Sequence, residues 1–180
     1  TSTSNNNEEK NKNKKNNSKN DSGDDNDKQR KVIKINPIEH YCKNQKSVSD
    51  EVIVVVTMTI KPGTTDKKIV SFTQMYSEFV KKTEPDTLGW SYHRSGKKII
   101  LIERYRNEEG NIITAKNISP GGQRYKLLQE ALGMLKVTEV NVYGGFTNKL
   151  INFNTKTAEE LKFDFPFNYY PTISGYSRNR

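Results

Sequence analysis

The large apolar residues of this chain are confined to its later part. The first 31 of its 180 residues contain no Val, Ile, Leu, Met, Phe, Tyr or Trp, and they consist mainly of Asn, Lys, Asp and Ser. A segment without such side chains cannot bury enough apolar surface to offset the entropy lost on ordering. We therefore expect residues 1–31 to form a disordered tail, with any globular domain beyond it.

Residues 32–49 are expected to form an extended arm or linker. Pro37 lies within their only apolar stretch, Val32–Ile38, and argues against a central strand there. The chain begins with Thr1 and shows no hydrophobic signal core. We expect a cytoplasmic location, and a targeting segment upstream of Thr1 is not excluded.

The composition excludes several kinds of chemistry. No apolar run approaches the roughly 20 residues that cross a bilayer, so no membrane span is expected. The single cysteine, Cys42, excludes an internal disulfide and a multi-cysteine metal site, while His40 and His93 are too far apart for a metal-binding motif. We therefore expect no metal. The net charge of +9 is compatible with an anionic ligand, a nucleic acid or simple solubility.

Apolar periodicity between residues 50 and 148 predicts a domain with the order strand, helix, strand, strand, helix, strand. The expected strands are Val52–Ile60, Thr87–His93, Lys98–Tyr105 and Val137–Phe146, and the expected helices contain Ile69–Val80 and Tyr125–Leu135. A short helix and loop are expected at 107–121. This order is the split βαβ unit of ferredoxin-like α+β folds.

The apolar pattern also predicts the strand order. Val52–Val56 and Ile99–Ile102 are continuous apolar runs, as in central strands, whereas the second and fourth strands contain polar residues, as at edges. This predicts an antiparallel sheet of order 4-1-3-2. Helices would cover only one face, so the other needs a partner, and a second copy of the chain is the simplest one. We therefore expect a homodimer.

The last segment, residues 149–180, is rich in aromatic residues. Residues 151–180 hold seven of the 17 aromatic side chains of the chain. A short helix is expected at Thr157–Lys162, followed by an extended stretch. Two interpretations are open: the extension packs on its own domain or on a dimer mate, or residues 151–180 dock onto another protein.

Three segments of the domain together resemble a known family. They are Lys61-Pro62-Gly63 after the first strand, Thr87-Leu88-Gly89-Trp90-Ser91-Tyr92 in the second, and Ile102-Glu103-Arg104-Tyr105 in the third. In this order they resemble the antibiotic biosynthesis monooxygenase (ABM) family of dimeric α+β barrel proteins. The resemblance covers about residues 50–148, and it implies a pairing of two such domains into a barrel.

The sequence departs from the family pattern at two positions. The E-x-W pattern of the third strand reads Glu103-x-Tyr105, and Ala115-Lys116-Asn117-Ile118 stands where the family has a helix histidine. Haem degradation through that histidine is therefore not expected. Other relatives oxidise aromatic polyketides or quinols with molecular oxygen and no metal or flavin. The resemblance thus implies a cofactor-free monooxygenase acting on an aromatic phenol or quinol.

Three residues are candidates for catalysis. Glu103 and Tyr105 share one face of a strand, where Glu103 could act as a general base and Tyr105 as a hydrogen-bond donor. The alternative is a surface ion pair beside a packed tyrosine. His93 could act as a base near neutral pH, although an exposed turn residue is an equally simple interpretation.

Four further residues are candidates for substrate binding. Trp90 and Tyr92 share a strand face and could line a pocket or simply pack in the core. Lys116 and Asn117 occupy the place of the family histidine and could hold a phenolate, or they could be surface residues.

The competing functions belong to three classes. The first is a small-molecule enzyme or binder, and the second is a catalytically silent dimeric scaffold that binds a protein through its aromatic extension. RNA binding is the third and is not expected, because the third strand displays Tyr105 as its only aromatic residue.

Overall fold

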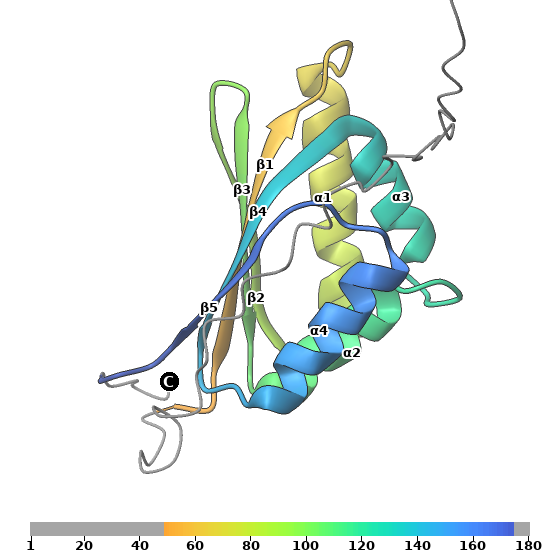
Figure 1. Ribbon diagram of the computed structural model, residues 1–180. Coiled ribbons are helices and arrows are strands. Elements are labelled where there is room, and N and C mark those ends of the chain that lie inside the picture. Colours follow the sequence, from red (N-terminus) through yellow and green to blue (C-terminus); the bar gives the residue numbers. More distant parts are fainter. Residues whose placement is uncertain (1–48, 175–180) are drawn as a thin grey trace, which may run out of the picture. The chain divides into compact units, whose positions relative to one another are not determined.

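The computed structural model describes residues 49–174 (Figure 1). The predictions for residues 1–31, and for the arm at 32–49 apart from Ser49, lie outside the described residues. The strands are β1 (Val52–Ile60), β2 (Thr87–Ser95), β3 (Lys98–Tyr105), β4 (Leu135–Gly144) and β5 (Phe167–Pro171). The helices are α1 (Asp66–Thr83), α2 (Glu108–Ile118), α3 (Tyr125–Met134) and α4 (Asn148–Glu160).

The strands form one sheet of order β2-β3-β1-β4-β5. β1 pairs antiparallel with β3 and β4, and β2 pairs antiparallel with β3, so the predicted order 4-1-3-2 is confirmed for the first four strands. β5 adds a fifth strand that pairs in parallel with β4. The sheet is therefore mixed, and β4, expected at the edge, is an inner strand.

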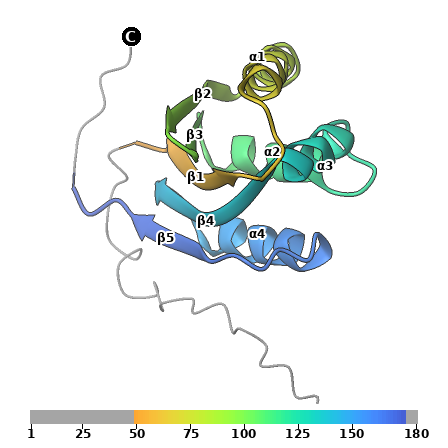
Figure 2. The same cartoon turned by 90° about the horizontal axis from the view of Figure 1, so that it is seen from above.

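All four helices lie on the same face of the curved sheet (Figure 2). α1 begins after Thr65, whose side chain accepts a hydrogen bond from the Lys68 amide, and it buries Ile69, Phe72, Tyr76 and Val80 against the sheet. Met75, on the same helix, is exposed. The helix-covered face therefore holds the core, as the sequence predicted.

The C-terminal segment packs on the same core. α4 starts at Asn148, well before the short helix expected at Thr157–Lys162, and its N-cap Thr147 donates from its amide and its hydroxyl to Glu108, both at 2.9 Å. Phe165, Phe167 and Tyr169 pack against the core cluster around β4. The first of the two interpretations of the extension therefore applies to residues 149–174, which pack on their own domain.

The opposite face of the sheet carries no described helix (Figure 2). Its central positions are apolar and half-buried: Ile53 and Val55 on β1, and Ile100 and Ile102 on β3. We call these four residues the open-face cluster. The expected homodimer would use this face, and it stays a prediction.

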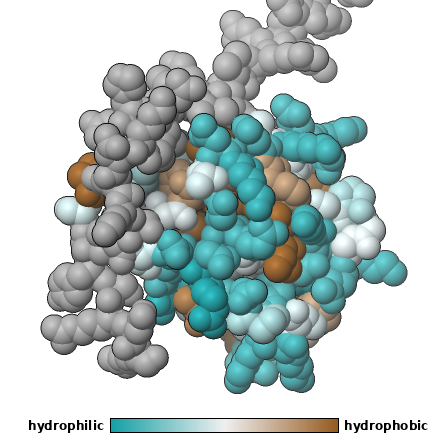
Figure 3. All heavy atoms as spheres, turned by 90° about the horizontal axis from the view of Figure 1, so that it is seen from below, coloured by the Kyte–Doolittle hydropathy of each residue, from teal (hydrophilic) through white to brown (hydrophobic). Residues whose placement is uncertain are grey.

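The surface of the described residues is otherwise mainly polar. Seen from below, hydrophilic side chains dominate it, and the hydrophobic residues form small separate patches (Figure 3). No helix within residues 49–174 combines the length and the apolar character needed to cross a membrane.

Candidate functional site

A cavity of about 140 Å³ lies between the helices and the covered face of the sheet. An apolar cavity of roughly this volume, ~150 Å³, holds a benzene molecule in an engineered protein. The size therefore suits a small ring compound. Strands β1, β2, β3 and β4 supply its floor, while α2, α3, α4 and the chain after α4 supply its walls.

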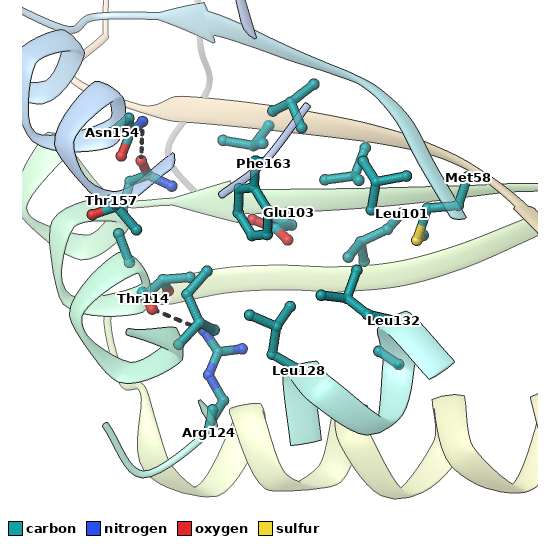
Figure 4. A pocket seen from close by; sticks show the side chains of 18 of the residues that line it. Met58, Leu101, Glu103, Thr114, Arg124, Leu128, Leu132, Asn154, Thr157 and Phe163 are labelled. Atoms are coloured by element: carbon teal, nitrogen blue, oxygen red, sulfur yellow. Dashed lines mark hydrogen bonds between the residues drawn. The ribbon is translucent and has the colours of Figure 1, made fainter. Parts of the chain in front are cut away.

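The lining of the cavity is divided by polarity, as Figure 4 shows. Glu103, Thr114, Arg124, Asn154 and Thr157 lie toward the side of α2 and α4. Met58, Leu101, Leu128 and Leu132 lie toward the other side, with α3. The cavity thus has a polar half and an apolar half, a combination that fixes the orientation of a ligand.

Glu103 is the acidic group of the polar half. It stands on β3 between Val54 of β1 and Trp90 of β2, and only 8% of it is exposed. The Tyr105 hydroxyl donates a hydrogen bond of 2.5 Å to its Oε2. Burial raises the pKa of Glu103 to about 7, although the bond from Tyr105 and the charge of Arg124 oppose this rise. Glu103 can therefore take up or release a proton near neutral pH.

Arg124 is the cationic group of the cavity and is fully buried. Its guanidinium lies 5.1 Å from the ring centre of Trp90 and 5.4 Å from that of Tyr76, which are cation–π distances. Its Nε is 2.9 Å from Oε1 of Glu84, an ion-pair distance, although the N–H lacks hydrogen-bonding alignment. The charge of Arg124 is thus neutralised inside the protein.

Glu84 is a second buried carboxylate, behind the cavity wall, and only 3% of it is exposed. It accepts hydrogen bonds of 2.7 Å from Thr114 and Asn117 and one of 3.3 Å from Thr87. Together with Arg124, these donors satisfy the carboxylate well. The ion pair with Glu84 therefore holds the Arg124 guanidinium against the rings of Trp90 and Tyr76.

Three aromatic side chains border the same region. Trp90 stacks on Tyr76 with ring centres 5.6 Å apart and meets Tyr92 edge-on at 6.4 Å. Burial raises the pKa of Tyr76 to about 12 and that of Tyr92 further above its usual value. Both phenols are therefore neutral donors. The buried indole nitrogen of Trp90 has no acceptor with hydrogen-bonding geometry in the described part of the chain.

A second set of polar groups comes from α2 and α4. Asn154 of α4 donates a hydrogen bond of 3.1 Å to Oδ1 of Asn111 on α2, and Thr157 lies one turn further along α4. All three residues are buried and line the cavity. We call Asn111, Asn154 and Thr157 the amide cluster.

The structure brings four of the seven predicted site residues together. Glu103, Trp90 and Tyr92 line the cavity, and Tyr105 supports Glu103 from behind. The shared face of Glu103 and Tyr105 is as predicted. The alternative of a surface ion pair for Glu103 does not apply, because the residue is buried and bonded to Tyr105.

The other three predicted residues do not line the cavity. His93 is exposed and pairs with the Ser91 hydroxyl at 3.0 Å. Lys116 is exposed, with its Nζ 5.8 Å from the ring centre of Phe153. Asn117 instead supports Glu84 through its side-chain amide. A role for these residues in a reaction at this cavity would have to be indirect.

Sequence reasoning missed Arg124 and the amide cluster. Arg124 occupies the N-cap position of α3 and makes no side-chain capping bond. A cation is unfavourable at that end of a helix dipole, so an arginine there signals another role. The amide cluster left no comparable signal, because Asn154 lies in the part of α4 that precedes the short helix expected at Thr157–Lys162.

No described residues form a cluster of three or more His, Cys, Asp or Glu that could hold a metal ion. The polar groups that surround the cavity are instead the Glu103 carboxyl, the Arg124 guanidinium paired with Glu84, and several neutral donors. This set can bind and deprotonate a weakly acidic hydroxyl group.

Solved structures of similar fold are known. MupZ from Pseudomonas fluorescens aligns with a TM-score of 0.52 at 15% identity, over 72% of this chain and 96% of MupZ. SnoaB, a cofactor-independent oxygenase from Streptomyces nogalater, aligns with a TM-score of 0.44 at 15% identity, over 55% of this chain and 93% of SnoaB. A protein assigned as an antibiotic biosynthesis monooxygenase from Chloroflexus aurantiacus J-10-fl aligns with a TM-score of 0.40 at 13% identity, over 54% of this chain and 94% of that protein.

The likeness to MupZ shows a shared fold, whereas the other two TM-scores are too low to carry an argument of their own. The described chain is therefore an α+β domain with a fold like that of MupZ, and the α+β fold class predicted from the sequence is confirmed. Neither the family models nor the sequences of curated proteins give a match to this chain.

Proposed function

We propose that the cavity binds a small aromatic phenol or quinol and that Glu103 removes its hydroxyl proton. The observation that carries the proposal is the carboxyl of Glu103, buried in the wall of a mostly apolar cavity with a pKa of about 7. Such a carboxyl matches the requirement for a general base at neutral pH. The neutral phenol groups of Tyr76 and Tyr92, which line the cavity, can donate hydrogen bonds to the resulting phenolate.

The reaction we propose is oxygenation by molecular oxygen without a metal or flavin. The phenolate passes one electron to dioxygen, and the resulting radical and superoxide combine at a ring carbon. Loss of water from this hydroperoxide leaves a carbonyl group. One oxygen atom thus enters the substrate, and the other leaves as water with two substrate hydrogens. The protein holds the phenolate, keeps bulk water away from it and exchanges the proton at Glu103.

An oxygen electrode tests this proposal with hydroquinone as substrate. The full chain should consume oxygen faster than a blank, and Glu103→Gln should lower the rate about 100-fold, the usual scale of general base catalysis. Glu130→Gln, on the exposed side of α3, is the matched control and should not change the rate. Oxygen uptake that is equal in wild type and Glu103→Gln would remove Glu103 from this role.

We also propose that two copies of the chain associate through the open-face cluster. Its four aliphatic side chains lie side by side on the two central strands, where Val55 faces Ile102 across the β1–β3 pair. Burying them against a second copy would gain hydrophobic free energy. Sedimentation velocity should show a dimer for the wild type and a monomer for Ile102→Lys. A wild type that remains monomeric at all concentrations would contradict the proposal.

A further inference from the structure

We propose that the amide cluster, built in part by α4, holds a second oxygen of the ligand, so that the substrate is an aromatic compound with two oxygen substituents. The inference rests on the proposed function, since it assigns the first oxygen to Glu103. It goes beyond that function because it makes the C-terminal segment a determinant of specificity. The ring and any apolar substituent would lie against the leucines of α3.

The first argument is the unused hydrogen-bonding capacity of the cluster. Thr157 and Asn111 are each more than nine-tenths buried and line the cavity. Within residues 49–174, no side-chain hydrogen bond uses the Thr157 hydroxyl or the Asn111 amide nitrogen. Because both residues line the cavity, these two groups are free to bond a group inside it. They therefore fit a ligand oxygen.

The second argument is the position of the cluster on α4. The side of this helix that faces the domain carries Leu150, Ile151 and Ala158, as a helix packed on a core should. Asn154 and Thr157 interrupt that apolar face where it meets the cavity (Figure 4). Asn154 also joins α4 to α2 through its bond to Asn111, whereas the Thr157 hydroxyl makes no such bond within residues 49–174 and is left for the cavity.

The third argument concerns charge. Arg124 is the only cation among the described residues that line the cavity, and Glu84 already neutralises it. A carboxylate or phosphate ligand would therefore find no free counter-charge. Neutral amide and hydroxyl groups bind hydroxyl and carbonyl oxygens instead. The ligand chemistry that fits both polar groups is a hydroquinone, a resorcinol or a hydroxylated ketone of an aromatic ring.

Matched probe pairs test this inference on the full chain. In p-cresol and m-cresol a methyl group replaces the second hydroxyl of hydroquinone and resorcinol. Binding is measured without oxygen through the fluorescence of Trp90, which is the only tryptophan of the chain and lines the cavity. We expect at least one diphenol to bind about tenfold more tightly than its cresol partner, since a polar site discriminates against a ligand that leaves it unpaired.

The decisive variant is Thr157→Val, which removes the hydroxyl and keeps the shape. It should weaken diphenol binding about 3- to 10-fold and leave cresol binding unchanged, because one neutral hydrogen bond is lost. Thr155→Val, on the same helix but outside the cavity lining, is the matched control and should change neither. A thermal unfolding curve for each variant confirms that it is folded.

The outcomes separate this inference from the proposed function. If diphenols and cresols bind equally, with Glu103→Gln weakening both and Thr157→Val neither, the second-oxygen assignment is wrong and the proposed function stands. If no phenol binds the wild type, both are overturned. A diphenol preference that Thr157→Val and Asn154→Leu reduce, while Thr155→Val does not, supports the inference.

Discussion

Glu84 and Glu103 are both buried carboxyl groups, but their surroundings differ. Glu84 has a guanidinium at 2.9 Å and three hydrogen-bond donors. Glu103 has one neutral donor, the Tyr105 hydroxyl, and otherwise faces the cavity. Their positions in the fold differ too. Glu84 is the C-cap residue of α1, whereas Glu103 lies on β3, an inner strand of the sheet.

This difference separates a buried carboxylate whose charge is compensated from one whose charge is not. The cation and donors around Glu84 offset the cost of burying its charge. Glu103 lacks such compensation, so burial favours its neutral form and raises its pKa to about 7. A group in this state can exchange a proton with a ligand. The following predictions test the contrast, from the largest expected effect to the smallest.

Arg124→Met should cause the largest loss of stability. The substitution leaves Glu84 buried without its cation, and breaking a buried pair in this way costs about 3–5 kcal/mol. Urea denaturation at pH 8 measures the free energy of unfolding. Arg94→Met is the control, because its ion pair with Asp66 is exposed and should contribute less than about 1 kcal/mol. Equal effects of the two substitutions would show that the Glu84–Arg124 pair is not structural.

The stability of the wild type should depend on pH through Glu103. Its pKa is about 7 in the folded protein and 4.5 in the reference state. Between these values the folded state holds a proton that the unfolded state has released, so stability falls as pH rises from 4.5 through 7. The full change is about 3 kcal/mol at 1.36 kcal/mol per pKa unit.

Glu103→Gln should remove this pH dependence. Urea denaturation of both proteins at several pH values between 4.5 and 8 gives the difference directly. As the pH rises, the variant should become more stable relative to the wild type, because an amide carries no charge to bury. Parallel curves over this range would mean that the Glu103 carboxyl keeps an ordinary pKa and is not poised for proton transfer.

Tyr105→Phe should change stability through the pKa of Glu103. The Tyr105 hydroxyl bond opposes the rise in the pKa of Glu103, so its loss should raise this pKa further. At pH 8, where the carboxylate is charged, we expect a loss of about 2 kcal/mol, and a smaller one at pH 5. In the Glu103→Gln background the difference between pH values should disappear. Its persistence there would mean that the Tyr105 hydroxyl acts on a titrating group other than Glu103.

Thr87→Val should have the smallest effect. The Thr87 hydroxyl donates to Glu84 at 3.3 Å, but Thr114, Asn117 and Arg124 remain as partners of that carboxylate. We expect a loss of about 0.5–1 kcal/mol, with no change in phenol binding. A loss as large as that of Arg124→Met would show that the Glu84 network cannot tolerate the removal of any one donor.

The fold was predictable as far as its signals were local. Continuous apolar runs marked β1 and β3 as central strands, and polar residues marked β2 as an edge, but the same signal wrongly placed β4 at the other edge. A short helix was expected at Thr157–Lys162, but the earlier part of α4 was not, because Asn154 and Thr157 stand among the apolar residues of its domain-facing side and weaken the helical period. The extended stretch that contains β5 was expected, but its parallel pairing with β4 was not, since no local pattern encodes that relation.

The candidate site was predictable where strand alternation applied. The period of two placed Trp90 with Tyr92 and Glu103 with Tyr105. His93 was expected as a base or as an exposed turn residue, and it is exposed on β2. Arg124, Asn111 and Asn154 come from three different helices. Their approach depends on how those helices pack, and a sequence period contains no information about that distance.

The order of the elements also matters while the chain is being made. α4 and β5 emerge last among the described elements, after the other strands of the sheet. Until β5 arrives, β4 has an unpaired edge beside Val140 and Val142, and such an edge is a template for pairing with other chains. During synthesis, the step that completes the cavity is therefore also the step that covers the edge of β4.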